Sequence, residues 1–78
     1  MNDNIFATRD LVLASFLRYN HVELVDGYDK DTKSWHFADI EKCNELSLQL
    51  RNGSAMVEVL QYESIRRNLL GMVHDRKN

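Results

Sequence analysis

Residues Thr8 to Asn20, TRDLVLASFLRYN, have an apolar periodicity that predicts a helix with Thr8 as its N-cap, and the rest of the chain is expected to pack around it. With 100° between successive residues, most of its circumference is apolar, and this broad arc contains Val12, Leu13, Ala14, Phe16 and Leu17. Ser15 and Arg18 flank Leu11 and form the polar stripe. A helix with so wide an apolar arc must be covered on more than one side. In a chain of 78 residues, we expect the rest of the chain to cover it.

Length and composition predict a single folded domain spanning residues 1–78. The chain is 44% hydrophobic and 28% charged, which is typical of a folded protein rather than a disordered one. The net charge of -2 argues mildly against a dedicated duplex-binding protein, because phosphate contacts need a basic surface. Cys43 is the single cysteine, so no internal disulfide forms and a reducing compartment is expected. No apolar run is long enough for a signal peptide or a membrane span, so we expect a cytoplasmic protein.

A β-hairpin is predicted directly after the first helix. Its strands are residues 21–28 and 33–38, and the polar residues 29–32 form a tight turn between them. In the second strand Trp35 and Phe37 alternate with Ser34 and His36, which places the two aromatic residues on the core side. Gly27 marks a bulge or a close approach of another segment.

The second half of the chain predicts a helix, a short strand and a final helix. Asp39 caps a helix over residues 40–51, and Asn52-Gly53 ends it, with one of the pair in the left-handed conformation. One face of this helix contains Ile40, Cys43, Leu46 and Leu50. Alternating Ala55, Val57 and Val59 predict a third strand over residues 54–59. The last helix is expected over residues 61–74, with an apolar face made of Tyr62, Ile65, Leu69, Met72 and Val73.

The predicted element order is therefore α-β-β-α-β-α, which belongs to the α+β class. If the third strand pairs beside the first, the sheet is a small antiparallel one of three strands in the order 2-1-3. The helices then pack on one face of this sheet, and the first strand of the hairpin lies in its centre.

Residues Phe6 to Leu17 fit the pattern F-x-T-x-D-L-x-L-A-x-F-L. In this opening the chain resembles a small domain-of-unknown-function family of bacteriophage and mobile-element proteins. Members of that family continue with a hairpin that ends in an aromatic-rich strand, then a helix, a short strand and a final amphipathic helix. The resemblance implies an accessory protein of a phage or prophage that works in the cytoplasm of a bacterial host. It implies no activity, cofactor or catalytic residue.

Residue types that bear chemistry are present, but their spacing predicts no catalytic, metal or cofactor site. His21, His36 and His74 lack the spacing of metal ligands, and we expect them at the surface or at strand edges. Cys43 falls on the apolar face of its helix, which predicts a buried core thiol. The aspartates at positions 26, 29, 31 and 39 fit turns and caps rather than a cation loop.

The candidate partner-binding residues are basic and lie near the ends of the last two helices: Arg51, Arg66, Arg67, Arg76 and Lys77. If they gather, they form a patch able to contact phosphates or an acidic protein; the alternative is an ordinary solvated helix face. The side chains of Tyr19, Tyr28, Trp35 and His36 offer a stacking platform for single strands. The alternative is that Trp35 and Phe37 belong to the core side of the hairpin.

The sequence favours a protein that is not an enzyme and that acts by binding another protein, either a host or defence component or a second copy of itself. A homodimer remains open because the first helix has enough apolar surface to offer one face to a partner. The alternative is a nucleic-acid-binding module that uses the C-terminal basic residues. No membrane partner and no cofactor are expected.

Overall fold

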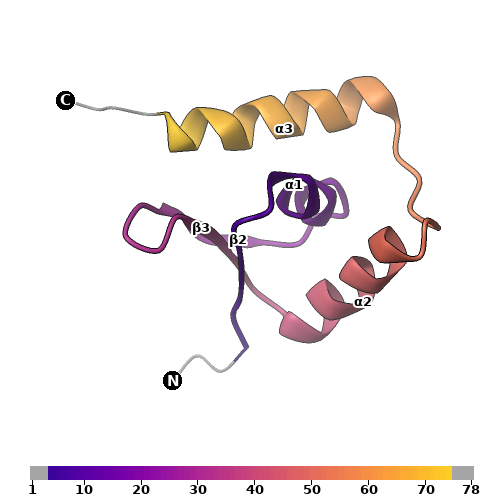
Figure 1. Ribbon diagram of the computed structural model, residues 1–78, viewed down its shortest axis with the longest axis horizontal. Coiled ribbons are helices and arrows are strands. Elements are labelled where there is room, and N and C mark those ends of the chain that lie inside the picture. Colours follow the sequence, from indigo (N-terminus) through magenta and orange to yellow (C-terminus); the bar gives the residue numbers. More distant parts are fainter. Residues whose placement is uncertain (1–3, 75–78) are drawn as a thin grey trace.

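The computed structural model describes residues 4–74, which form three helices and a three-stranded antiparallel sheet. The elements in chain order are β1 (Phe6–Thr8), α1 (Leu11–Tyr19), β2 (Leu24–Asp29), β3 (Ser34–Phe37), α2 (Ile40–Arg51) and α3 (Val59–Val73). Figure 1 shows α1 between the sheet and α3, with α2 beside α1. The predicted α+β class and the antiparallel sheet are confirmed.

The helix α1 is the centre of the molecule, as its sequence predicts. Five consecutive residues, Leu13 to Leu17, are buried, so the middle of α1 is covered around its whole circumference. The predicted polar stripe is wrong at Ser15, which is fully buried, and the apolar arc is wrong at Val12, which is 50% exposed. The Ser15 hydroxyl donates to the carbonyl oxygen of Leu11 at 2.7 Å, so its burial leaves no unsatisfied group.

Thr8 is not the N-cap of this helix, and the predicted start is corrected to Leu11. The cap is Asp10, whose carboxylate accepts from the main-chain N–H of Val12 at 2.9 Å and from that of Leu13 at 3.4 Å. Thr8 instead ends β1, and its hydroxyl accepts from the main-chain N–H of Asp10. An ionised carboxylate is a stronger acceptor than a hydroxyl, so the helix begins where Asp10 can cap it.

The predicted third strand over residues 54–59 is wrong, and the third strand of the sheet is β1. In its pairing with β3, Phe6 lies opposite Phe37 and Thr8 lies opposite Trp35. The strand order is β1-β3-β2, so the second strand of the hairpin is central rather than the first. β1 has three residues, too few for an alternating pattern to show in the sequence.

The predicted turn over residues 29–32 and the predicted bulge at Gly27 are both present in the hairpin. The Asp29 carboxylate accepts from the main-chain N–H groups of Asp31 and Thr32, which fixes the turn. Asp26 and Gly27 both have positive φ, and the register of β2 shifts between Leu24 and Tyr28. This bulge lies on an edge strand, where irregular geometry discourages pairing with another sheet.

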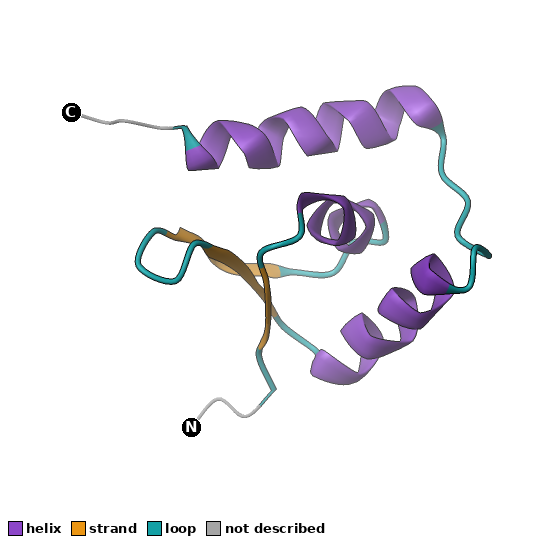
Figure 2. Cartoon of the chain, in the orientation of Figure 1, coloured by secondary structure: helices purple, strands orange, loops and turns teal. Residues whose placement is uncertain are grey.

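The helices α2 and α3 are close to their predicted ranges. α2 has its expected bounds, with Asp39 as the cap, and Gly53 has a positive φ just after it. α3 begins at Val59 rather than at residue 61, because the carboxylate of Glu58 caps it by accepting from the main-chain N–H groups of Leu60 and Gln61. Figure 2 shows α2 and α3 joined by a loop at one end of the molecule.

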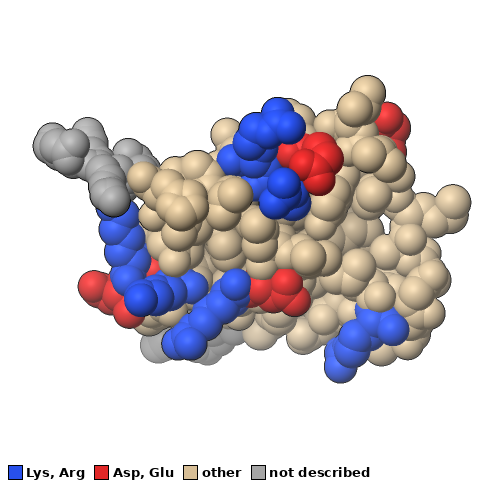
Figure 3. Space-filling model, turned by 45° about the horizontal axis from the view of Figure 1, so that its top comes forward, with Lys and Arg blue, Asp and Glu red and all other residues tan. Residues whose placement is uncertain are grey.

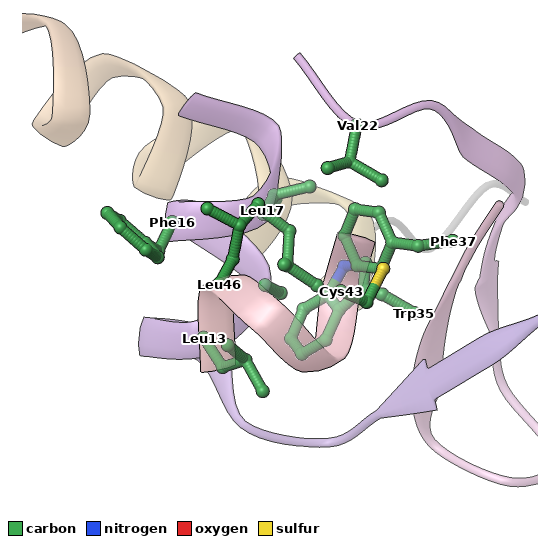
Figure 4. Packing of buried hydrophobic residues seen from close by; sticks show 10 residues of the cluster. Leu13, Phe16, Leu17, Val22, Trp35, Phe37, Cys43 and Leu46 are labelled. Carbon is green, nitrogen blue, oxygen red and sulfur yellow. The ribbon is translucent and has the colours of Figure 1, made fainter. Parts of the chain in front are cut away.

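The core joins side chains from α1, α2, α3 and β3 (Figure 4). Phe37 and Leu17 are fully buried, and Trp35 is 3% exposed, so the aromatic residues of the hairpin belong to the core as predicted. Cys43 is buried as predicted, and its thiol donates to the carbonyl oxygen of Ala38. Burial raises the pKa of this thiol to about 11, so Cys43 stays protonated at neutral pH.

Candidate interaction surface

The largest exposed apolar side chains gather in the segment that leads into α3. Met56 is 87% exposed, Leu60 is 77% exposed and Val59 is 66% exposed, while Val57 is 36% exposed. These four residues, Met56, Val57, Val59 and Leu60, are called the apolar corner below. Single exposed apolar residues are common on proteins, whereas a run of this kind is less common.

The position of the apolar corner is fixed by hydrogen bonds to α1. The hydroxyl of Tyr19 accepts from the main-chain N–H of Glu58 at 2.8 Å. One turn into α3, the hydroxyl of Tyr62 donates to the carbonyl oxygen of Val12 at 3.2 Å. Ala55 packs against the core from the other side of the corner. The apolar side chains are therefore exposed on a held segment rather than on an unattached loop.

Val12 at the start of α1 is a further exposed apolar residue. Its carbonyl oxygen accepts from Tyr62, which lies one helical turn after Val59, so Val12 and the start of α3 are neighbours. The side chain of Val12 is half-exposed rather than part of the core. Burial of Tyr62 at this junction raises the pKa of its hydroxyl, so it remains a hydrogen-bond donor at neutral pH.

The predicted basic residues do not form one patch among the described residues. Arg51 is the last residue of α2, whereas Arg66 and Arg67 lie midway along α3. Arg76 and Lys77 lie outside the described residues. Figure 3 shows Lys and Arg in separate groups with acidic side chains among them. In the same view, the end of the molecule that contains the loop between α2 and α3 has acidic and basic side chains at its margins, with uncharged atoms between them.

Arg66 is engaged within its own helix. Its guanidinium Nε donates to the Glu63 carboxylate at 3.2 Å, and a terminal nitrogen donates to the same group at 3.2 Å. This hydrogen bond lowers the pKa of Glu63 and raises that of Arg66. The pair is nearly neutral as a unit, so Arg67 is the residue of the two that offers positive charge to a partner.

The predicted stacking platform is also wrong as a surface for single strands. Trp35 is buried and contacts Tyr28 with the ring centroids 5.0 Å apart. A base can stack only on a ring that has an exposed face, so Trp35 does not serve this purpose.

A polar cluster that the sequence did not predict occupies the other face of the hairpin. The Ser34 hydroxyl lies 2.6 Å from the Thr32 hydroxyl and 3.1 Å from His36 Nε2, and Asp29 Oδ2 lies 3.9 Å from the same nitrogen. Main-chain hydrogen bonds, first that from Asp31, lower the pKa of Asp29. Ser34 and Asp29 approach one ring nitrogen of His36, whereas in a catalytic triad the hydroxyl and the carboxylate contact different ring nitrogens. The cluster therefore holds the turn rather than activating Ser34.

Within residues 4–74, no group of three or more His, Cys, Asp or Glu side chains is arranged to hold a metal ion. The same part of the chain contains no helix with the length and apolar character needed to cross a membrane. A hollow between the end of α1 and the start of α2 is lined by polar side chains that include His21, Glu23 and Lys42, and it is open to solvent. The apolar corner is thus the feature with the clearest indication of a partner.

Comparison of the chain with models of protein families, with curated proteins and with solved structures found no match.

Proposed function

We propose that this protein is not an enzyme and that it acts by binding another protein through the apolar corner. The observation that carries the proposal is the exposure of Met56, Val59 and Leu60 on a segment that hydrogen bonds hold against α1. Apolar area exposed in this way costs solvation free energy, at about 25 cal/mol for each Å² that a partner would cover. A protein partner with an apolar surface recovers that free energy on binding.

The charge distribution supports a protein partner over a nucleic acid. Arg66 is paired with Glu63, and the face in Figure 3 shows Lys and Arg with acidic side chains beside them. A nucleic-acid site needs several cations close together, because affinity depends on counterions released from the phosphates. By the resemblance at Phe6 to Leu17, the partner is a host or defence protein in the cytoplasm of a bacterium, or a second copy of this chain.

The test is capture of partners from a bacterial extract on the immobilised full chain, with and without nuclease. Two double variants accompany the original chain: Met56→Ser with Leu60→Ser in the apolar corner, and Arg66→Glu with Arg67→Glu on α3. We expect capture that resists nuclease, is lost in the corner variant and is retained in the arginine variant. Both pairs are on or near the surface, so circular dichroism should show both variants folded.

A direct gel-shift with random duplex or single-stranded DNA complements this capture. At about 150 mM salt we expect no binding tighter than about 10 μM. Sub-micromolar, salt-sensitive binding that the arginine variant abolishes would contradict the proposal and would assign the protein to nucleic-acid binding instead.

A further inference from the structure

The dipeptide Asn52-Gly53 lies directly after the last residue of α2, and both of its residues are exposed. Within residues 4–74, the side-chain amide of Asn52 has no hydrogen-bond partner. In contrast, the amide of Asn20 donates to the carbonyl oxygen of Phe16 at 2.8 Å. The carbon atom Cγ of the Asn52 amide is therefore open to water and to attack by a neighbouring nucleophile.

The main-chain nitrogen of Gly53 is the nucleophile that follows Asn52 in the chain, and it is loosely held. Its N–H donates to the carbonyl oxygen of Leu50 at 3.3 Å, which is longer than the usual range of about 2.7–3.2 Å. A side chain at Gly53 would meet no atom within 4 Å, so the space around this residue is open. Because glycine has no side chain of its own, little obstructs rotation of the peptide that links it to Asn52.

We propose that Asn52 is a site of non-enzymatic deamidation, with the Gly53 nitrogen as the nucleophile and water as the co-reactant. The Gly53 nitrogen loses its proton and forms a bond with Asn52 Cγ, the bond between Cγ and the amide nitrogen breaks, and ammonia leaves. Water then opens the resulting five-membered imide at either of its carbonyl carbons. The products are aspartate, which has the original main chain, and isoaspartate, in which the main chain runs through the side chain.

Two other exposed asparagines of the chain lack these features. Asn44 lies inside α2 and Asn68 lies inside α3. In an α-helix the next main-chain N–H is held by a hydrogen bond to a carbonyl oxygen one turn earlier. The residues that follow, Glu45 and Leu69, also have side chains that obstruct ring closure. Asn44 and Asn68 are thus internal controls that match Asn52 in exposure but not in the group that follows.

Deamidation would alter the connection between α2 and the apolar corner. The N–H of Ser54 donates to the carbonyl oxygen of Gln49 at 3.0 Å, and this bond helps to satisfy the last carbonyl groups of α2. Isoaspartate adds a carbon atom to the main chain just before this donor, which displaces it. Either product places a negative charge at the C-terminal end of α2, where the helix dipole is also negative. The end of α2 is therefore weakened, whatever partner the apolar corner binds.

The experiment is incubation of the folded full chain in neutral and in mildly alkaline buffer, followed by trypsin digestion and mass spectrometry. Cleavage after lysine and arginine places Asn44, Asn52 and Asn68 in three different peptides. We expect Asn52 to lose its amide much faster than the other two and to give both aspartate and isoaspartate. The rate should rise with pH, because the attacking nitrogen must lose its proton. A sample digested without incubation gives the background of the digestion.

Two variants test the role of the neighbouring nitrogen. Gly53→Ala should slow the loss of the amide, because the methyl group obstructs ring closure, although the φ of 74° strains alanine. Asn52→Gln keeps the glycine and an amide but requires a larger ring, and it should also react more slowly. Circular dichroism verifies that each variant is folded.

Three results would overturn the inference. The first is an Asn52 amide that is retained as fully as those of Asn44 and Asn68 in the original chain, a comparison that needs no variant. The second is aspartate without isoaspartate, which would show direct hydrolysis rather than attack by Gly53. The third is a Gly53→Ala variant that folds and loses the Asn52 amide as fast as the original chain.

Discussion

The middle of α1 and the apolar corner are both rich in apolar residues, yet they have opposite environments. Leu13 to Leu17 is buried around the whole helix, whereas Met56, Val59 and Leu60 lie mostly in solvent. The difference comes from their neighbours: α1 is covered by the sheet, α2 and α3, while the corner lies in the loop and first turn at one end of the molecule. Apolar composition thus shows that a surface needs cover, and the topology decides whether the same chain supplies it.

The largest loss of stability is expected from Leu17→Ala in α1. Leu17 is fully buried, so the substitution removes apolar contacts and leaves a cavity. We expect a loss of about 3–5 kcal/mol in the free energy of unfolding. Urea denaturation followed by circular dichroism measures the loss. A change below about 1 kcal/mol would show that α1 is not the centre of the core.

A smaller loss is expected from Asp10→Ala at the start of α1. The substitution removes the carboxylate that caps the helix, which should cost about 1 kcal/mol. Thr8→Ala is the control, because the Thr8 hydroxyl contacts the N–H of Asp10 rather than the first helical turn. A loss of stability in Thr8→Ala that equals or exceeds that in Asp10→Ala would show that Thr8 is the N-cap of α1.

Leu60→Ala in the apolar corner is the matched partner of Leu17→Ala, because both remove the same atoms from a helix. Leu60 is 77% exposed, so unfolding at low protein concentration should change by no more than about 0.5 kcal/mol. The same denaturation experiment compares the two variants side by side. A loss near that of the α1 variant would place Leu60 in the core of the monomer.

The smallest effect on stability is expected from Asp29→Asn in the hairpin, because this substitution changes neither α1 nor the apolar corner. The folded-state pKa of Asp29 is below its ordinary value, so its charge adds stability above the unfolded pKa of about 3.8, and that stability is lost as the pH falls through the folded value. The amide oxygen of asparagine preserves the turn but does not titrate. Stability measured from pH 6 to about pH 2 should therefore fall less steeply in the variant. Parallel curves would show that this charge is without effect.

Regular periodicity made much of the fold predictable. The bounds of α2, its Asp39 cap and the burial of Trp35, Phe37 and Cys43 all follow from spacing and cap chemistry. The third strand was not predictable in this way, because the pairing of Phe6 to Thr8 with β3 is a long-range contact that leaves no local signal. Residues 54–59 have the alternation of a strand but find no partner in the sheet.

The candidate site was less predictable than the fold. The basic residues of α3 are evident in the sequence, and the spacing of Glu63 and Arg66 places the two on one face of the helix. Their ion pair means that Arg66 is not a free cation of the predicted basic patch. The alternation of β3 places Ser34 and His36 on the same face of the strand. Asp29 lies near His36 because the turn of the hairpin reverses the chain direction. The apolar corner was not predicted, because two of its residues, Val57 and Val59, belong to the alternation that predicted a third strand.

Thermal unfolding of Leu17→Ala and of the double variant Met56→Ser, Leu60→Ser separates the core position of α1 from the surface position of the apolar corner. At low protein concentration, the Tm of the corner variant should match that of the original chain, because Met56 and Leu60 are mostly exposed. Leu17→Ala should lower the Tm by many degrees, because Leu17 is fully buried. A corner variant whose Tm is as low as that of Leu17→Ala would place the corner in the core and would contradict the account.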